Sequence, residues 1–379
     1  MEVGKSNIMQ KMAIFLPSLA GGGAERVMLH LGDGLAKRGI HVDLVVSHLS
    51  GEYVSEIPVT VYVIDLNKKR LSHSFFKFAI YLRKNQDSVV LTTLQYSNIF
   101  CLLVKKLFFL KNRIVIRESN AISKKFNGSE IRSKIYLYLI RWLYPSADKI
   151  IAVSKGIKEE LHHFLKINHE KITVIPNPIK LPSNISLNNE SSFHAWLKPG
   201  QPPVVLGVGR LVKQKDFSTL IKAFSLVVKS VVCRLIILGE GPEMSLLKKL
   251  AFNLGIEGDV DFPGFNLDPF SYMKRAKVFV LSSLWEGFPN ALIQALACGC
   301  PVVSTNCPYG PSEILAGGKY GKLVEVKDHN RMAKEIIETL QSKNSSVNNE
   351  KWFYKYNYQN ILSQYQEVIF NEIAKNNHN

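Results

Sequence analysis

Short apolar runs alternate with longer stretches of helical periodicity along the whole chain of 379 residues. A run of this kind, bounded by glycine, asparagine or charged residues, is typical of a buried strand. Its regular alternation with helical patterns predicts βαβ units on parallel sheets. The predicted strands are Met12–Leu16, Val42–Ser47, Val59–Ile64, Val89–Thr93, Arg113–Arg117, Ile150–Val153, Ile172–Ile175, Val204–Val208, Arg234–Leu238, Val260–Phe262, Val278–Ser282, Val302–Thr305 and Lys322–Val324.

A stretch rich in proline, asparagine and serine interrupts this alternation over residues 177–202. Such a composition is typical of a linker, and the chain is long enough for two domains that each bury a core. We therefore predict an α/β protein with two Rossmann-like, doubly wound parallel-sheet domains, 1–176 and 203–345, facing across a ligand-binding cleft. Residues 346–379 are expected to form a C-terminal helix that packs back on the N-terminal domain.

Positive charge is concentrated in one segment. The chain has 48 basic and 31 acidic residues, a net charge of +17, and Leu66–Lys149 alone has 17 basic and 4 acidic residues, a net +13. Such an excess calls for an anionic partner: nucleic acid, a phosphorylated small molecule or a membrane surface. Ile131–Tyr144 mixes cations with aromatic residues, which favours an anionic bilayer over a solvated helix face. No nucleic-acid-binding motif is present, so nucleic acid is not expected as a partner.

The five cysteines indicate a reducing compartment, because their number is odd and none has the spacing of metal ligands. Cys298 and Cys300 fit buried positions better than a redox pair. No stretch has the length of a membrane span. Met12–Leu16 leads into glycines and a helix rather than into a signal-peptide cleavage site. We expect a cytoplasmic protein.

Two loops that follow predicted strands have residues suited to bind phosphate. Gly21–Gly23 precedes a helix over Ala24–Lys37, so its amides favour either a phosphate or sugar at the helix N-terminus or a plain tight turn. After Val204–Val208, Arg210 and Lys215 can clamp a diphosphate or form a solvated surface pair. A nicotinamide site is not expected, because a valine replaces the third glycine of the dinucleotide fingerprint.

The segment Trp285–Gln294 follows the predicted strand Val278–Ser282. Pro289 suits the first turn of a helix that runs to Cys298. Glu286 would lie just outside that helix and Gln294 on one of its first turns, so both can line one pocket. Capping of the helix is the alternative for Glu286. Asp259 and Asp261 spell a metal-binding pair, but they open a strand instead of ending one, so no metal site is predicted.

Motifs follow one another in a fixed order over nearly the whole chain: Gly-Gly-Gly-Ala-Glu25, Ser154-Lys-Gly156, Pro176-Asn177-Pro178, Gly209-Arg210 with Lys215, Gly239-x-Gly241, the block from Glu286 to Pro301, and Gly310-Pro-x-Glu313. Together they resemble the retaining glycosyltransferases of family 4. The resemblance implies the GT-B fold, with an acceptor-binding first domain and a second domain that binds a nucleotide sugar. It also implies that neither a metal ion nor another cofactor is needed.

The resemblance implies a role for each matching position. Arg210, Lys215 and Glu286 would be catalytic. The two cations would bind the diphosphate, and the carboxylate would accept hydrogen bonds from hydroxyls of the donor sugar. Gln294 replaces the second glutamate of the family's Glu-x7-Glu signature, which predicts weaker nucleotide binding. The donor-binding positions would be Gly22, Gly23, Gly209, Gly239, Gly241, Glu243, Phe288, Pro289, Asn290, Ala291, Leu292 and Gln294.

In the first domain, Glu118, Ser119 and Asn120 replace a histidine that many relatives carry, and they would bind the acceptor. This loop and the Tyr309-Gly-Pro form of the late loop are similar to enzymes that transfer N-acetylhexosamine in polysaccharide or lipopolysaccharide biosynthesis. We expect metal-independent, retaining transfer of a hexose or N-acetylhexosamine from a UDP-sugar to a lipid-linked or polysaccharide acceptor, on the inner face of the membrane. The alternatives are a GT-B nucleotide-sugar epimerase and a non-catalytic protein that binds nucleotide sugar or nucleic acid.

Overall fold

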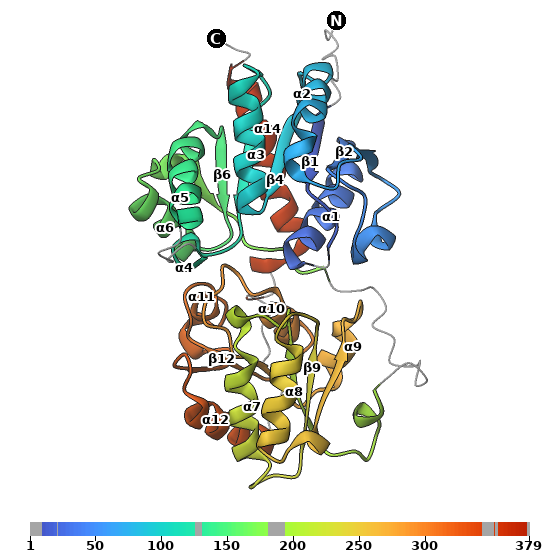
Figure 1. The fold of residues 1–379 in the computed structure, drawn as a ribbon, viewed down its shortest axis with the longest axis vertical. Coiled ribbons are helices and arrows are strands. Elements are labelled where there is room, and N and C mark those ends of the chain that lie inside the picture. Colours follow the sequence, from blue (N-terminus) through green and yellow to red (C-terminus); the bar gives the residue numbers. More distant parts are fainter. Residues whose placement is uncertain are drawn as a thin grey trace, which may run out of the picture. The chain divides into compact units, whose positions relative to one another are not determined.

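Each half of the chain forms a parallel sheet with helices on its faces, as Figure 1 shows. The computed structural model describes residues 10–20, 22–125, 131–180, 194–342, 352 and 355–376. Within them, one compact unit combines the first 178 residues with those from 355 onward, and the second unit covers residues 179–354. The predicted α/β class with two doubly wound parallel sheets is confirmed.

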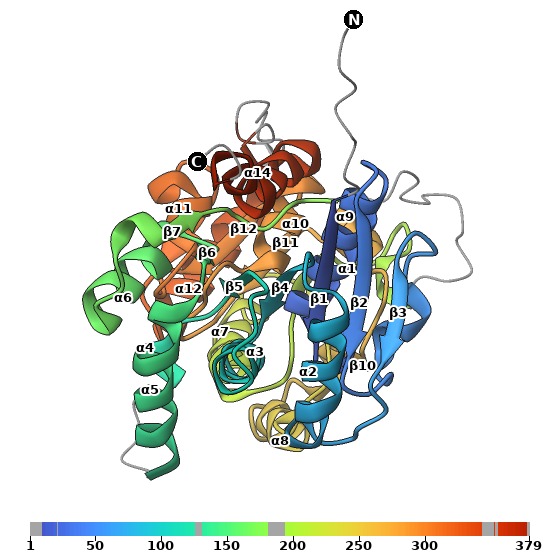
Figure 2. The same ribbon diagram turned by 90° about the horizontal axis from the view of Figure 1, so that it is seen from above.

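The first unit contains the strands and helices β1 (Lys11–Leu16), α1 (Gly23–Ala36), β2 (His41–Val46), β3 (Tyr62–Asp65), α2 (Phe75–Lys84), β4 (Val89–Thr93), α3 (Gln95–Leu107), β5 (Ile114–Glu118), α4 (Ile122–Lys125), α5 (Ile131–Leu143), β6 (Lys149–Ala152), α6 (Lys155–Leu165), β7 (Ile172–Val174) and α14 (Tyr358–Asn376). Its strand order is β3-β2-β1-β4-β5-β6-β7. Helices α2, α3 and α5 lie on one face of this sheet, and α1 and α14 lie on the other (Figure 2).

The second unit contains β8 (Val204–Val208), α7 (Phe217–Val227), β9 (Arg234–Leu238), α8 (Met244–Asn253), β10 (Val260–Gly264), α9 (Pro269–Arg275), β11 (Val278–Leu281), α10 (Asn290–Ala297), β12 (Val302–Thr305), α11 (Pro311–Ile314), β13 (Lys322–Val324) and α12 (His329–Gln341). Its strand order is β10-β9-β8-β11-β12-β13. Within the described residues of the chain, no helix combines the length and the hydropathy needed to cross a bilayer.

Central strands carry unbroken apolar runs because helices cover both faces of a parallel sheet. All of β4 is buried, for example. The edge strand β3 differs. A strand beginning at Val59 was predicted, but β3 begins at Tyr62, and Val59 lies fully exposed in a turn. The predicted start of this strand was therefore wrong. The prediction assumed that apolar residues such as Val59 are buried, whereas residues at the edge of a sheet can be exposed.

A buried arginine ties the C-terminal helix α14 to the first sheet. Arg117, in β5, is fully buried. Its Nε donates to the Tyr365 hydroxyl at 3.0 Å, and its Nη1 donates to Thr93 Oγ1 at 3.0 Å. Its Nη2 donates to Asn177 Oδ1. Because these oxygens satisfy the guanidinium, its burial is tolerated, and α14 is fixed to the carboxyl end of β5.

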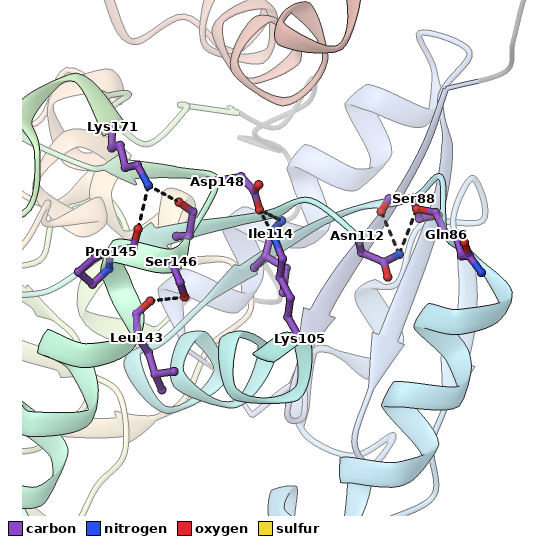
Figure 3. A network of polar contacts seen from close by, with 11 residues as sticks. Gln86, Ser88, Lys105, Asn112, Ile114, Leu143, Pro145, Ser146, Asp148 and Lys171 are labelled. Atoms are coloured by element: carbon purple, nitrogen blue, oxygen red, sulfur yellow. Dashed lines mark hydrogen bonds and ion pairs between the residues drawn. The ribbon is translucent and has the colours of Figure 1, made fainter. Parts of the chain in front are cut away.

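Polar side chains also hold the first sheet together at the amino ends of its strands (Figure 3). Lys105 Nζ, near the end of α3, lies 2.7 Å from Asp148 Oδ2. The same carboxylate oxygen accepts the N–H of Ile114 at 2.7 Å. Asn112 Nδ2 donates to the carbonyl oxygen of Asn85 at 2.7 Å. The last turn of α3 is therefore held against the starts of β5 and β6.

Candidate functional site

The loops that follow β8 and β11 lie together in the second unit. These two strands are neighbours, and the chain proceeds outwards from them in opposite directions, so they form the topological switch point of the sheet. The Leu284 N–H donates to the Gln214 carbonyl at 2.8 Å, and Gln214 Nε2 donates to the Trp285 carbonyl at 2.8 Å. Ligands of doubly wound sheets bind at the carboxyl ends of strands at such a point.

Lys215 and Glu286, one from each loop, form a close ion pair. Lys215 Nζ lies 2.5 Å from Glu286 Oε1, and the two side chains are 18% and 7% exposed. Ser283 Oγ donates to the same oxygen at 2.6 Å. Among the residues that the structure describes, none donates a hydrogen bond to Glu286 Oε2. One carboxylate oxygen is thus anchored and the other is left to accept from a ligand.

Three hydroxyl side chains that sequence reasoning missed support this pair. Ser282 Oγ donates to the Lys215 carbonyl at 2.7 Å, and Thr305 Oγ1 donates to the Ser283 carbonyl at 2.7 Å. All three hydroxyl residues are buried. A usable signal was present in the sequence, because Ser282 and Ser283 are the two residues after the buried strand β11, and Thr305 ends the buried strand β12. Polar residues at such positions lie at the carboxyl ends of the strands, where doubly wound sheets bind ligands.

Replacing Ser283 by alanine is expected to lower kcat about 3- to 10-fold with little change in the KM for donor, because one hydrogen bond to a charged group is lost and Glu286 is held less firmly. Steady-state kinetics with the variant measures both constants. Ser225→Ala is the matched control, since that buried hydroxyl donates within α7 to the Lys222 carbonyl. Equal loss in both variants would mean that Ser283 acts through stability alone.

Arg210 supplies an accessible cation in the same loop as Lys215. Its side chain is exposed, and within the described part of the chain it makes no ion pair. Gly209, the preceding residue, packs against the stem of Lys215. A Cβ at Gly209 would lie 3.3 Å from Lys215 Cε. Gly209, Arg210 and Lys215 thus lie in the loop that follows β8, and their roles toward a diphosphate stay predictions.

The predicted glycines of the β9 loop lie against the backbone of the β8 loop. Gly239 and Gly241 have φ of +135° and +157°. A side chain at either position would overlap the carbonyl oxygen of Gly209 or Leu211. The Glu243 N–H donates to the Leu211 carbonyl at 3.0 Å. The structure thus brings Gly239, Gly241 and Glu243 to the loop that carries Arg210.

The residues after Glu286 divide into two groups. Phe288 and Leu292 are 5% and 0% exposed, so their side chains belong to the core. Asn290, Ala291 and Gln294 are partly exposed on α10. Pro289 takes the N-cap position, one residue before the predicted first turn, and Gly310 with φ +96° packs against it. Only the partly exposed group can present side chains to a ligand.

Two further candidate chemistries find no support. Burial and the neighbouring Glu286 carboxylate raise the pKa of the Cys307 thiol to about 12, which leaves it protonated and a poor nucleophile at neutral pH. The carboxylate of Asp261 contacts the ring of His194, and its Oδ2 lies 2.6 Å from His194 Nε2. Within the described residues no group of histidine, cysteine and carboxylate side chains is arranged to hold a metal ion.

The predicted acceptor loop lies in the first unit, after β5. Glu118 is 1% exposed, and its carboxylate accepts the Tyr144 hydroxyl at 2.8 Å, Gln95 Nε2 at 3.1 Å and the Asn120 N–H at 3.3 Å. Burial and the Glu118 charge raise the pKa of Tyr144, which keeps its hydroxyl a donor. Glu118 therefore holds the loop, while Ser119 and Asn120 are partly exposed.

Gly22 and Gly23 also belong to the first unit, where α1 begins at Gly23. The Gly22 carbonyl accepts the N–H of Arg26 at 3.2 Å. A side chain at Gly22 would overlap the carboxylate of Glu25, which is folded back over it. Gly21 lies outside the described residues. The Glu25 carboxylate thus fills the space over Gly22 at the N-terminus of α1, and the role of both glycines toward a donor stays a prediction.

Two protein-family models match the chain. The model described as Glycosyltransferase Family 4 matches residues 21–181, and the model described as Glycosyl transferases group 1 matches residues 188–359. A Campylobacter jejuni N-acetylgalactosamine-N,N'-diacetylbacillosaminyl-diphospho-undecaprenol 4-alpha-N-acetylgalactosaminyltransferase is 32% identical over 346 residues, which cover 88% of this chain and 91% of that enzyme. A GalNAc-alpha-(1->4)-GalNAc-alpha-(1->3)-diNAcBac-PP-undecaprenol alpha-1,4-N-acetyl-D-galactosaminyltransferase from the same organism is 27% identical over 358 residues, covering 90% and 93%.

Solved structures share the fold. Anabaena HepE in complex with UDP and glucose has a TM-score of 0.78 and 18% identity, covering 95% of this chain and 99% of HepE. Sucrose-phosphate synthase from Thermosynechococcus elongatus has a TM-score of 0.80 and 20% identity, covering 97% and 100%. At such identities the likeness concerns the fold alone.

Proposed function

The chain belongs to glycosyltransferase family 4, and we propose that it transfers an N-acetylhexosamine or hexose from a UDP-sugar to a lipid-linked acceptor with retention of configuration. The Lys215–Glu286 pair and the exposed Arg210 at the switch point of the second sheet carry this proposal. The names of the Campylobacter relatives support an N-acetylhexosamine and a diphospho-undecaprenol acceptor. The UDP complex of HepE supports uridine diphosphate as the leaving group.

The difficult step is departure of the nucleoside diphosphate from the anomeric carbon, because negative charge develops on the leaving phosphate. Arg210 would bind the diphosphate through its planar fork and Lys215 as a point charge. The N-terminus of α10, four residues after Glu286, adds partial positive charge. Fixed cations of this kind stabilise developing charge without reorganising. We propose that they suffice without a metal ion or other cofactor.

Glu286 would orient the donor sugar. Lys215 and Ser283 hold Oε1, so Oε2 can accept sugar hydroxyls from a fixed position. A carboxylate restrained in this way is suited to bind the sugar instead of attacking its anomeric carbon. We therefore propose that the acceptor hydroxyl attacks from the side of the leaving group, which retains the configuration.

Thermal shifts with a panel of nucleotide sugars test donor binding. A ligand that binds only the folded state raises stability by about 2.7 kcal/mol at a hundredfold excess over Kd. UDP and a UDP-N-acetylhexosamine should raise Tm, and GDP- and ADP-sugars should not. Shifts with a purine nucleotide sugar alone would overturn the UDP assignment, and hydrolysis or epimerisation without transfer would favour another activity.

Gln294→Glu is expected to tighten UDP binding about 3- to 10-fold. Gln294 is partly exposed on α10, and a carboxylate there would turn a neutral hydrogen bond with ribose into a charge-assisted one. Titration calorimetry with UDP measures the change. Gln341→Glu, at the exposed end of α12, is the matched control. Unchanged or weaker UDP binding in Gln294→Glu would remove Gln294 from the ribose site.

A further inference from the structure

Helix α5 exposes an apolar stripe to solvent, and Figure 2 shows the helix projecting from the first unit. At 3.6 residues per turn, positions i, i+4, i+7 and i+11 lie within about 60° of one another. The side of α5 toward the core is separate, since Ile140 and Leu143 are fully buried. Packing of the core therefore does not account for the stripe. Its members are Ile131 (76% exposed), Ile135 (53%), Tyr138 (69%) and Trp142 (43%).

Cations border this stripe. Lys134 and Arg141 of α5 are exposed, and α5 contains no acidic residue. Lys106 Nζ, at the end of α3, lies 4.1 Å from the centroid of the Trp142 ring. Lys105, by contrast, forms an ion pair with Asp148 at the amino ends of β5 and β6 (Figure 3). Lys106, Lys134 and Arg141 therefore place positive charge where the apolar side chains are exposed.

The apolar surface extends from α5 across the end of α3 to α2. Leu107 and Phe109 are 54% and 91% exposed, and Phe109 has a φ of +53°, which is costly for a residue with a side chain. The ring of Phe108 lies 5.7 Å from that of Phe76. Phe76 and Ile80 of α2 are 70% and 54% exposed. So many large exposed side chains on one face of a unit indicate an interaction surface.

We propose that this surface binds an anionic lipid bilayer. We call it the docking face and define it by Phe76, Ile80, Lys106, Leu107, Phe109, Ile131, Lys134, Ile135, Tyr138, Arg141 and Trp142. Aromatic and aliphatic groups would enter the boundary between headgroups and acyl chains, while the cations contact lipid phosphates. The docking face has three cations and no acidic residue, which favours an anionic bilayer over a second copy of the chain, whose docking face would carry the same positive charge. The inference rests on the proposed function only in that a lipid-linked acceptor resides in such a membrane.

Flotation of the full chain with phosphatidylglycerol and phosphatidylcholine vesicles tests the proposal. The wild type should partition onto the anionic vesicles and much less onto the neutral ones. Ile135→Ser with Tyr138→Ser should lower the partition coefficient about tenfold or more, because two inserting side chains are lost. Lys106→Gln with Lys134→Gln should lower it about fivefold for each charge.

Val59→Ser with Val63→Ser is the matched control. Both valines are exposed, in the edge strand β3 or the turn before it, and neither belongs to the docking face, so the double variant should bind vesicles like the wild type. Equal partition of the Ile135/Tyr138 variant and the wild type, or no preference for anionic lipid, would overturn the proposal. So would a wild-type dimer that becomes monomeric in the same variant without a change in flotation. UDP-induced thermal shifts without vesicles report on donor binding separately, so failure of docking and failure of the proposed function remain distinguishable.

Discussion

Arg210→Ala is expected to lower kcat/KM for sugar transfer by about 10²- to 10³-fold, the usual loss when one preorganised group that stabilises developing charge is removed. The guanidinium would act on the leaving diphosphate, where charge is greatest in the transition state. Since Arg210 is exposed and makes no ion pair within the described residues, its loss should leave Tm unchanged. Steady-state kinetics and thermal melts of the same preparation measure the two effects.

Two variants make this result specific. Arg210→Lys keeps the charge but not the planar fork, so it should recover only part of the activity. Lys248→Ala removes an exposed charge from α8 in the same unit and should leave kcat/KM nearly unchanged. An Arg210→Ala variant with more than a third of wild-type kcat/KM would exclude Arg210 from the reaction.

Glu286→Gln is expected to lower kcat/KM about 10- to 100-fold, because hydrogen bonds to sugar hydroxyls lose the charge of their acceptor. UDP affinity should change less than about threefold, since Glu286 is assigned to the sugar and not to the nucleotide. The amide keeps the shape of the side chain, so Ser283 can still donate to it. Kinetics with the UDP-sugar and calorimetry with UDP alone separate the two effects.

Glu257→Gln is the control for loss of a carboxylate, because Glu257 is exposed in the turn before β10. It should not alter either measurement. If Glu286→Gln weakened UDP binding as much as it slowed transfer, the carboxylate would have to act on the nucleotide or on the fold. Its assignment to the donor sugar would then be wrong.

The core strands of both sheets were predictable from sequence because a strand covered on both faces must be apolar throughout. Val89–Thr93 and Val204–Val208 were predicted with the bounds that the structure has. The edge strand at Tyr62 was misplaced because the apolar residues before it, such as Val59, are exposed. The pattern of apolar residues predicts which residues are buried. At the edge of a sheet strand residues can be exposed, so this pattern predicts the bounds of an edge strand poorly.

The candidate site was predictable only in part. Motif order identified Arg210, Lys215 and Glu286, but no pattern along the chain shows that Ser283 and Thr305 form the support beneath Glu286. That support depends on β11 and β12 being neighbours in the sheet. Likewise, Glu118 resembles an accessible acid in sequence, yet Tyr144 and Gln95, both distant along the chain, enclose it. Position at a strand end marks Ser283 and Thr305 as candidate site residues, but tertiary packing decides which groups they contact.

Transfer from a radiolabelled UDP-N-acetylhexosamine to an undecaprenyl-diphosphate-linked saccharide, followed by lipid extraction and NMR of the product, tests the proposed reaction most directly. With a chelator present, the wild type should form a labelled lipid whose new linkage has the α configuration of the donor, and Arg210→Ala should form almost none. An inverted linkage, or no labelled lipid with any UDP-sugar while the nucleotide sugar is hydrolysed or epimerised, would contradict a retaining, metal-independent transferase.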